Sequence, residues 1–255
     1  MSNTLSGKVA IVTGGSRGIG AGITYELAKR GAKVAVTYTS ESSAEKTDQL
    51  VARIAELENG SKAVKIKADL RDTSSPKQIV EATLAAFPGD AIDILVNNAG
   101  CLLTRNLGDI THEDFAYIYD LNVRATVFMT QEILPYLRRP GRIVNIGSVG
   151  ARGGFPGYSL YGSSKAAMEA LTRSWATELG PKGHTVNVVH PGPTETDMVT
   201  EVTESIVTAQ KKATPMENRM GTVDDVAQIV AFLAEERSRW VTGQSISASG
   251  GYAMY

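Results

Sequence analysis

Short runs of aliphatic residues alternate along the chain with longer segments in which apolar residues recur every three or four positions. A continuous apolar run favours a buried strand, and the longer spacing favours an amphipathic helix. The runs predict strands at Val9–Val12, Val34–Val36, Val64–Ile66, Ile92–Val96, Ile143–Ile146 and Val186–Val189, with a weaker one at Ser245–Ser247. Because helical segments separate successive strands, right-handed crossovers should join the strands into a parallel sheet with helices on both faces.

The third apolar run differs from the others. Its apolar residues Val64, Ile66 and Ala68 alternate with Lys65 and Lys67. Alternation indicates one exposed face and suits an edge strand, which is where a doubly wound order puts the third strand. No internal repeat, low-complexity tract or linker divides the chain. The sequence therefore predicts a doubly wound, Rossmann-type α/β fold with a seven-stranded, mainly parallel sheet, in one domain spanning residues 1–255.

Composition and charge narrow the class of protein. The 255 residues are 42% hydrophobic, and the formal charge of −1 gives no long-range attraction to nucleic acid or anionic membranes. Cys101 is the only cysteine and the three histidines lack metal-ligand spacing, so we expect neither a disulfide nor a metal site. Met1–Gly7 has no apolar signal core, and no run approaches the roughly 20 apolar residues of a membrane span. We expect a cytoplasmic protein.

A glycine-rich turn follows the first predicted strand and precedes a helical segment. It reads Thr-Gly-Gly-Ser-Arg-Gly-Ile-Gly over Thr13–Gly20, a variant of the usual G-x-G-x-x-G spacing. Glycines let the backbone approach a ligand closely, and a helix N-terminus offers free N–H groups to a phosphate. A glycine turn without a ligand is the less favoured alternative. The turn predicts a dinucleotide site.

Tyr161 and Lys165 lie four residues apart at the head of a long helical pattern. Such residues share one helix face, with Cβ atoms about 5–6 Å apart. A nearby ammonium favours the phenolate and lowers the pKa of a tyrosine towards the range of an acid–base catalyst. Ser148 follows an apolar run, so its hydroxyl should lie at a strand end, where it can bond a carbonyl substrate. The spacing alone is weak, because an exposed helical Tyr and Lys would give it too.

Five motifs in order resemble the short-chain dehydrogenase/reductase superfamily, specifically its single-domain branch, over nearly the full length of the chain. They fall on Thr13–Gly20, Asn97–Gly100, Ser148, Tyr161 with Lys165, and Pro191–Thr196. The structural asparagine of the family's catalytic tetrad falls on Asn122. The resemblance implies that Asn122, Ser148, Tyr161 and Lys165 are catalytic. It also implies that Asn122 holds a water that links Lys165 to solvent.

The resemblance further implies a nicotinamide dinucleotide cofactor. Asp69 would accept from the adenine amino group, although an Asp that caps a turn would look the same, and Thr194 and Thr196 would hold the carboxamide. The implied cofactor-binding residues are Gly14, Ser16, Arg17, Gly18, Ile19, Gly20, Tyr38, Thr39, Ser40, Asp69, Leu70, Asn98, Ala99, Gly100, Tyr161, Lys165, Pro191, Gly192, Thr194 and Thr196.

The end of the second strand distinguishes the two nicotinamide cofactors. NAD sites carry an acidic residue there for the ribose 2′-hydroxyl, whereas NADP sites need a cation for the 2′-phosphate. Here Thr39 and Ser40 supply hydroxyls, and Arg17 in the glycine turn can supply the charge. The acidic Glu41 would instead favour NAD, but it lies two or three residues beyond the strand end. There it should begin the next helix, where an acid in the first turn is favourable. The sequence predicts NADP(H).

These residues predict an NADPH-dependent carbonyl reductase. Ser148 and Tyr161 would bond the substrate oxygen, Tyr161 would transfer its proton, and Lys165 would lower the pKa of Tyr161 and bind the nicotinamide ribose. The preference for NADPH favours reduction. One alternative is an NAD(P)-dependent alcohol or polyol dehydrogenase working oxidatively, and a remote one is a non-catalytic NADP-binding redox sensor.

The segment Glu195–Met220, with Met198 and Met216, should form a lid over the substrate. Gly150–Gly157 should form the facing wall, where Phe155 either packs within its loop or contacts substrate. Tyr38-Thr39-Ser40 and Gly147-Ser148 resemble the polyhydroxynaphthalene-type reductases of the family, which favours a cyclic, aromatic or β-keto substrate.

Family resemblance also implies a homotetramer formed through Asn122–Leu137, Tyr158–Gly180, the last helix and strand and an apolar tail ending at Tyr255.

Overall fold

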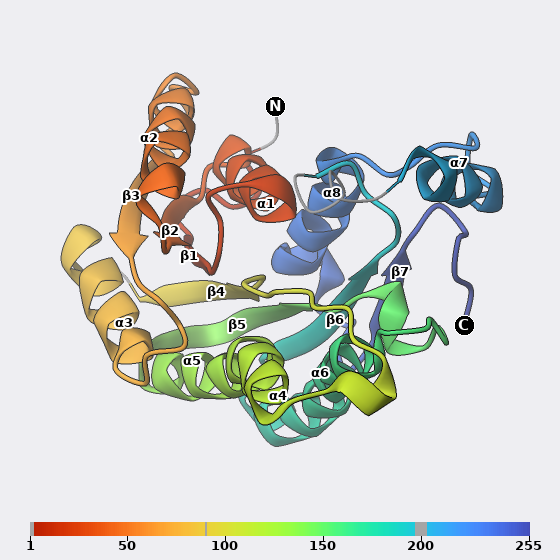
Figure 1. The fold of residues 1–255 in the computed structure, drawn as a ribbon. Helices are drawn as coiled ribbons and strands as arrows, with labels where there is room; N and C mark the ends of the chain where they lie inside the picture. The colour runs from red at the N-terminus through yellow and green to blue at the C-terminus, as the bar shows by residue number, and fades with distance from the viewer. Residues whose placement is uncertain (1–2, 90, 197–202) are drawn as a thin grey trace.

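Seven parallel strands form one sheet in the order β3-β2-β1-β4-β5-β6-β7 (Figure 1). The computed structural model describes residues 3–89, 91–196 and 203–255. The strands are β1 (Val9–Val12), β2 (Lys33–Tyr38), β3 (Lys62–Lys67), β4 (Ile92–Asn97), β5 (Leu137–Ile146), β6 (Thr185–Pro191) and β7 (Ser245–Ala248). The doubly wound α/β fold predicted from the sequence is confirmed.

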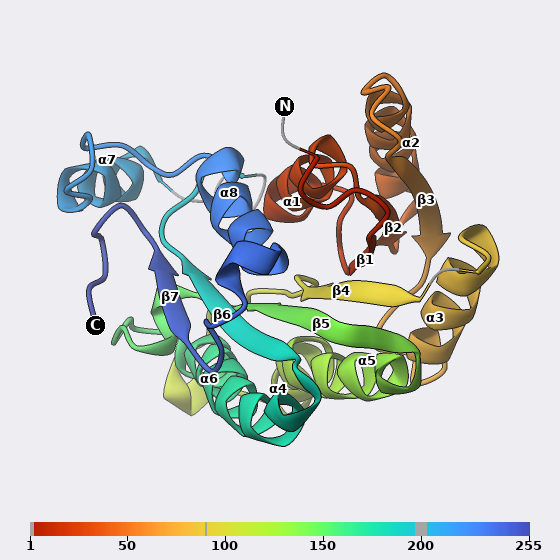
Figure 2. The ribbon, with the colours of Figure 1, turned by 180° about the vertical axis from the view of Figure 1, so that it is seen from behind.

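Helices cover both faces of this sheet (Figures 1 and 2). They are α1 (Gly18–Lys29), α2 (Glu41–Ala55), α3 (Ser75–Ala86), α4 (His112–Tyr119), α5 (Ala125–Ile133), α6 (Ser159–Leu179), α7 (Glu204–Ala213) and α8 (Val223–Ala234). One apolar core packs α1, α2 and α8 against the sheet, and a second packs α3, α5 and α6 against its other face. Within the described ranges, no helix is long and apolar enough to cross a membrane.

All seven predicted strands are present, and the largest difference in bounds is at β5. This strand begins at Leu137, six residues before the predicted start at Ile143. Its first part, Arg138–Pro140, is exposed and polar, and the pairing register with β4 shifts there. An irregular, solvated strand end leaves no hydrophobic period, so the sequence pattern could not place it.

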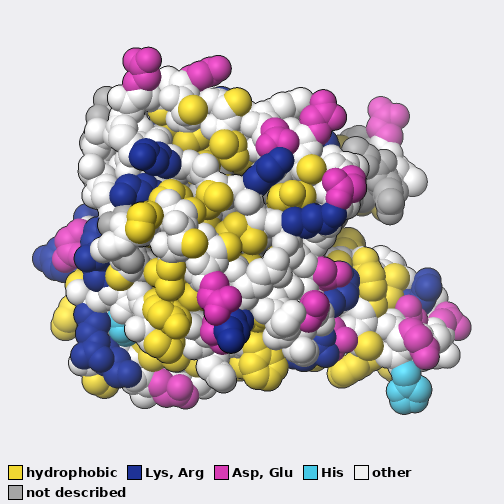
Figure 3. All heavy atoms as spheres, turned by 90° about the vertical axis from the view of Figure 1, so that its left-hand side faces the viewer, with side chains coloured by type: hydrophobic (Ala, Val, Ile, Leu, Met, Phe, Trp, Pro, Cys, Tyr) yellow, Lys and Arg dark blue, Asp and Glu magenta, His cyan; other side chains and the backbone are white. Residues whose placement is uncertain are grey.

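The third strand lies at the edge of the sheet, as its alternating pattern predicts. Lys65 pairs with Asp48, and Lys67 pairs with Glu41, so two of the three exposed lysines of β3 bond carboxylates of α2. Figure 3, which views the side of the molecule with α2, β3 and α3, shows cationic and anionic side chains interspersed on this face. Charged residues on an edge strand disfavour pairing with another chain.

The strand order positions the functional residues. The chain reverses direction across the sheet between β1 and β4, which pair with each other although β2 and β3 lie on the far side of β1. In open parallel sheets, ligands bind at the carboxyl ends of the strands beside such a reversal. The segments that follow β1, β4, β5 and β6 therefore share one edge of the molecule.

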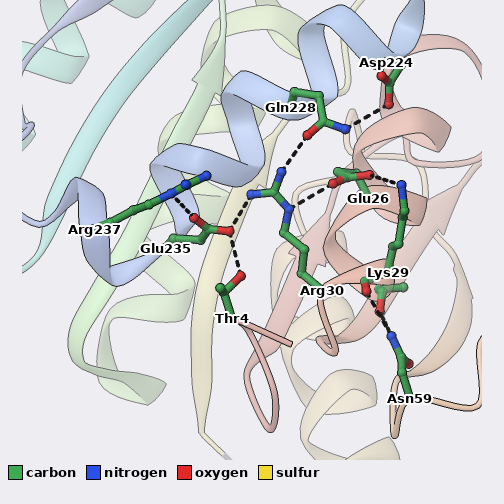
Figure 4. A network of polar contacts seen from close by, with 10 residues as sticks. Thr4, Glu26, Lys29, Arg30, Asn59, Asp224, Gln228, Glu235 and Arg237 are labelled. Carbon is green, nitrogen blue, oxygen red and sulfur yellow. Dashed lines mark hydrogen bonds and ion pairs between the residues drawn. The ribbon is translucent and has the colours of Figure 1, made fainter. Parts of the chain in front are cut away.

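On the α1–α8 side, a buried carboxylate joins distant parts of the chain (Figure 4). Glu235 follows α8. Its side chain bonds Arg30, which directly follows α1, and Thr4 near the N-terminus, and it pairs with Arg237. The guanidinium of Arg30 also bonds Glu26 at 2.9 Å and Gln228 of α8. Removing one partner of a buried ion pair leaves the remaining charges uncompensated.

We therefore expect Glu235→Ala to lower the free energy of unfolding by about 3 kcal/mol and the Tm by several degrees. The matched control is Glu217→Ala, because Glu217 pairs with Arg219 at an exposed site and should cost less than about 0.5 kcal/mol. Thermal unfolding of both variants checks this. Equal Tm values would show that the buried network stabilises nothing.

Candidate active site

Helix α6 carries Tyr161 and Lys165 on the side that faces the end of β5. Lys165 is only 5% exposed, and its Nζ donates to the backbone oxygen of Ile146 at 3.0 Å. The same Nζ lies 5.9 Å from the centre of the Tyr161 ring. The predicted helix and the shared face of these two side chains are confirmed.

Ser148 stands directly opposite Tyr161. It lies two residues after β5, where its Oγ accepts a hydrogen bond from the backbone N–H of Gly150 at 3.0 Å. The Ser148 side chain and the Tyr161 ring also lie near each other, because a Cβ on Gly150 would be 3.3 Å from Ser148 Oγ and 3.5 Å from Tyr161 Cε1. Two hydroxyls near each other at a strand end can both bond one substrate oxygen.

The pKa values of this group differ from the sequence-based expectation. Burial raises the pKa of Tyr161, and the bond to Ser148 opposes that effect only in part. The expected lowering by Lys165 is wrong for this structure, because the ammonium bonds the Ile146 carbonyl instead of the phenol. Burial lowers the pKa of Lys165 to about 8. Desolvation disfavours the charged form of both groups.

Asn122 clamps the loop after β4 to helix α6. Its Oδ1 accepts from the backbone N–H of Cys101 at 2.9 Å, and its Nδ2 donates to the Cys101 carbonyl and to Ser164 Oγ, each at 3.0 Å. A Cβ on Gly100 would lie 3.2 Å from Asn122 Oδ1 and 3.3 Å from Lys165 Nζ. The structure thus brings Asn122 and Lys165 together around Gly100. A water relay through Asn122 stays a prediction.

The glycine turn has the shape of a phosphate cradle. Gly14 and Gly18 adopt φ values of +60° and +52°, a region that side chains disfavour. A Cβ on Gly20 would lie 2.3 Å from the Gly14 carbonyl oxygen. The turn opens α1, a 12-residue helix whose first N–H groups face it. These features fit the pyrophosphate of a dinucleotide.

The side chain of Asn98 holds this turn through hydrogen bonds to its backbone. Its Nδ2 donates to the carbonyls of Thr13 and Gly14, both at 2.9 Å. Thr13 Oγ1 accepts in return from the backbone N–H groups of Asn98 and Ala99. The sequence indicated Asn98 only as a cofactor-binding residue. Its bonds to the turn depend on contacts between residues 85 apart in the chain, which local spacing does not show.

The segment after β6 returns to the glycine turn. The Cγ2 of Thr196 is 3.5 Å from where a Cβ on Gly18 would lie, and Thr194 Oγ1 bonds the Gly192 carbonyl at 3.0 Å. The turn and the segment that starts at Pro191 therefore flank one site. Met198 of the predicted lid lies outside the described residues, whereas α7, within the same predicted segment, has no buried residue.

The residues beyond β2 lie at the far end of this site. Arg17 is exposed at the start of α1, without a capping bond. Ser40 caps α2, and Glu41 opens that helix and pairs with Lys67, which lowers the pKa of its carboxyl. Asp69 bonds the backbone N–H of Arg71, so the turn-capping alternative describes its contact here.

The other predicted cofactor residues differ in exposure. Ser16, Tyr38 and Leu70 are buried, Thr39 is exposed, and Ile19, Ala99 and Gly192 are partly exposed.

Comparison with known proteins agrees with this geometry. The family described as "Enoyl-(Acyl carrier protein) reductase" matches residues 14–253. Dehydrogenase OXI1 of Cochliobolus heterostrophus is 48% identical over 231 residues, which covers 87% of this chain and 97% of that relative. Hydroxynaphthalene reductase-like protein Arp2 of Metarhizium guizhouense is 41% identical over 262 residues, covering 97% and 96%.

A solved structure of a short chain dehydrogenase from Burkholderia cenocepacia in complex with NADP has a TM-score of 0.89 at 41% identity. The match covers 98% of this chain and 99% of that one. The fold, the site and these relatives define an oxidoreductase with a nicotinamide-cofactor site. The chain belongs to the short-chain dehydrogenase/reductase family.

Proposed function

We propose that this protein is an NADPH-dependent carbonyl reductase in which Tyr161 donates the proton. The observation that carries the proposal is the grouping of the Ser148 and Tyr161 side chains around Gly150, with Lys165 Nζ 5.9 Å from the centre of the Tyr161 ring. The raised pKa of Tyr161 keeps its proton in place at neutral pH, as a general acid requires.

The residues of the chain divide the work of reduction. A bound nicotinamide supplies the hydride. Ser148 and Tyr161 donate hydrogen bonds to the carbonyl oxygen as negative charge develops there, and Tyr161 passes its proton to that oxygen. Lys165, held on the Ile146 carbonyl, provides positive charge near the phenolate that remains. Asn122 fixes the loop that closes over Lys165.

The preference for NADPH rests on charge at the far end of the site. Arg17 is exposed beside the glycine turn, and Glu41 faces Lys67, so its carboxylate is neutralised. Thr39 and Ser40 offer hydroxyls, and the start of α2 offers backbone N–H groups to a 2′-phosphate. These features favour the phosphorylated cofactor.

Arg17→Ala should raise the KM for NADPH about tenfold or more and leave the KM for NADH nearly unchanged, because only NADPH carries the phosphate that the guanidinium bonds. Steady-state kinetics with both cofactors measure this. Arg53→Ala, which removes an arginine stacked on Tyr25, is the control and should change neither value. An equal effect of Arg17→Ala on both cofactors would contradict the assignment.

The substrate class that fits best is a cyclic or aromatic ketone. Phe155, Tyr158 and Tyr161 form a series of edge-to-face rings, each pair with centres 5.8 Å apart. This series leads from the wall segment to the proposed acid, and flat apolar rings stack well on such a surface. The hydroxynaphthalene reductase-like relatives are in keeping with that choice.

The experiment that tests this function is the loss of NADPH absorbance with a panel of cyclic, aromatic and β-keto carbonyls. Turnover with NADPH, and slower turnover with NADH, is the expected result. Oxidation of alcohols with no reduction of any carbonyl would favour the dehydrogenase alternative. Cofactor binding without turnover in either direction would favour a redox sensor.

A homotetramer also stays a proposal. Large apolar side chains remain exposed on α4 and α5, among them Phe115, Tyr117 and Phe128. Such side chains in a group favour contact with another copy. The last residue, Tyr255, was expected to pack on a neighbouring subunit, but here its ring contacts Arg152 and His190 of its own chain.

A further inference from the structure

A buried histidine lies directly behind Ser148. His190, the penultimate residue of β6, has no exposed surface. Its Nδ1 lies 3.0 Å from the backbone nitrogen of Ser148 and 2.8 Å from the backbone oxygen of the same residue. The imidazole therefore contacts the backbone of the residue whose hydroxyl lies near Tyr161. None of the roles proposed above for Ser148, Tyr161, Lys165 or Asn122 accounts for it.

Gly147 provides the space that this imidazole occupies. A Cβ on Gly147 would lie 2.5 Å from Nδ1 of His190 and 2.6 Å from its Cε1. Heavy atoms do not approach so closely, so any side chain at position 147 would push the ring away from Ser148. The glycine and the histidine, 43 positions apart in the chain, are complementary in shape.

The other edge of the ring faces a carboxylate. His190 Nε2 lies 3.3 Å from Oε1 of Glu169, which is buried on α6 one helical turn after Lys165. Arg152, in the turn that follows Ser148, bonds both oxygens of Glu169 through three contacts of 2.9–3.1 Å. The chain of contacts thus starts at Ser148, passes through His190 and Glu169, and returns to the turn after Ser148.

The neutral ring of His190 can hold the backbone of Ser148 in either tautomer. Burial lowers the pKa of His190, so the ring is neutral at neutral pH. With the proton on Nδ1 the ring donates to the Ser148 backbone oxygen, and with the proton on Nε2 its Nδ1 accepts from the Ser148 N–H. Nε2 faces Glu169 without a hydrogen bond among the described residues. Without the imidazole these buried backbone groups would lose a partner, at a cost typical of a missing buried hydrogen bond.

We propose that His190 is a positioning residue for carbonyl reduction: it fills the space left by Gly147, holds the backbone of Ser148, and through Glu169 ties Ser148 to the helix that carries Tyr161. The effect on catalysis rests on the proposed reductase function. The hold on the Ser148 backbone is a property of the folded chain and is measurable without turnover.

Four variants test the proposal: His190→Ala, His190→Asn, Gly147→Ala and the double variant Gly147→Ala/His190→Ala. An asparagine places its amide oxygen or nitrogen near the position of Nδ1, so His190→Asn keeps a hydrogen-bond partner for the Ser148 backbone and loses the contact with Glu169. His190→Ala should lower kcat about ten- to a hundredfold, as loss of alignment by about 1 Å does. The Kd for NADPH should not change, and His190→Asn should recover most of the rate.

The double variant distinguishes a loss of the fit between Gly147 and His190 from a general destabilisation of the fold. Gly147→Ala should lower kcat in the wild-type background, because its methyl group displaces the imidazole. It should cost little in the His190→Ala background, where the space is empty. Equal effects of Gly147→Ala in the two backgrounds would overturn the proposed fit between these residues.

Hydrogen–deuterium exchange of the segment containing the Ser148 amide gives a readout that needs no activity. Exchange should be faster in His190→Ala and near the wild-type rate in His190→Asn. Wild-type exchange together with wild-type kcat in His190→Ala would overturn the proposal. If the wild-type chain reduces no carbonyl, the reductase function fails, and the exchange rates alone decide whether His190 holds Ser148.

Discussion

Tyr161→Phe should lower kcat for carbonyl reduction by about 10²–10⁴-fold, the range that a positioned general acid contributes. The phenylalanine ring keeps the packing against Tyr158 but loses the hydroxyl that would transfer the proton. Because the hydroxyl acts on the developing charge, the loss should appear in kcat, with the Kd for NADPH unchanged. Steady-state kinetics and fluorescence titration with NADPH measure the two quantities.

Tyr158→Phe is the matched control for this variant. Tyr158 directly precedes α6, and its ring centre lies 5.8 Å from that of Tyr161. Removing its hydroxyl leaves the ring in place and should change kcat by only a few-fold. Comparable losses in the two variants would mean that the site needs both hydroxyls, and an unchanged kcat in Tyr161→Phe would remove Tyr161 from the role of acid.

Lys165→Met should abolish most activity and at the same time stabilise the protein at neutral pH. Reduction should slow roughly a hundredfold or more, because the charge near the developing phenolate is lost. Burial lowers the pKa of Lys165 from an ordinary 10.5 to about 8. That gap corresponds to a cost of about 3 kcal/mol for burying the charged form at neutral pH.

Part of this gain is offset by the lost hydrogen bond to the Ile146 carbonyl, which contributes about 1 kcal/mol. A net gain of about 2 kcal/mol should raise the Tm by roughly 4–8 °C. Lys77→Met, at an exposed site on α3 where the lysine pairs only with Glu81, should leave the Tm nearly unchanged. A Tm below that of the wild type at pH 7 would contradict the burial cost.

The pH dependence of this stability difference has a defined sign. Between about pH 8 and pH 10.5 the unfolded chain binds the Lys165 proton and the folded chain does not. The free energy of unfolding of the wild type therefore increases as the pH rises across this window. The variant has no lysine at position 165, so its stability lacks this increase. The advantage of Lys165→Met should be greatest below pH 8 and should shrink towards pH 10.

The fold and the places of the candidate hydroxyls were predictable because they depend on local pattern. Buried strands and the glycine turn leave short-range signals, and Tyr161 and Lys165 share a helix face through their spacing alone. The contacts that hold Ser148 left no such signal. His190 meets it across 42 positions of sequence, and only the adjacent Gly147 marks the site.

The pKa values could not be read from spacing either. A separation of four residues placed Lys165 near Tyr161, but the direction of each shift depends on burial and on which acceptor the ammonium selects. The lysine bonds the end of β5, so desolvation determines both pKa values. The tertiary environment determines the pKa values, and helical spacing in the sequence carries no information about that environment.

The most direct test of the central claim follows the hydride itself. Wild-type protein would be given NADPH that carries deuterium in place of both hydrogens on the reactive carbon of its nicotinamide, with the cyclic and aromatic ketones of the panel. The products would be analysed by mass spectrometry. The proposed function predicts an alcohol carrying one deuterium on the former carbonyl carbon, formed far more slowly by Tyr161→Phe. Binding of the deuterated cofactor with no deuterium in any product would contradict it.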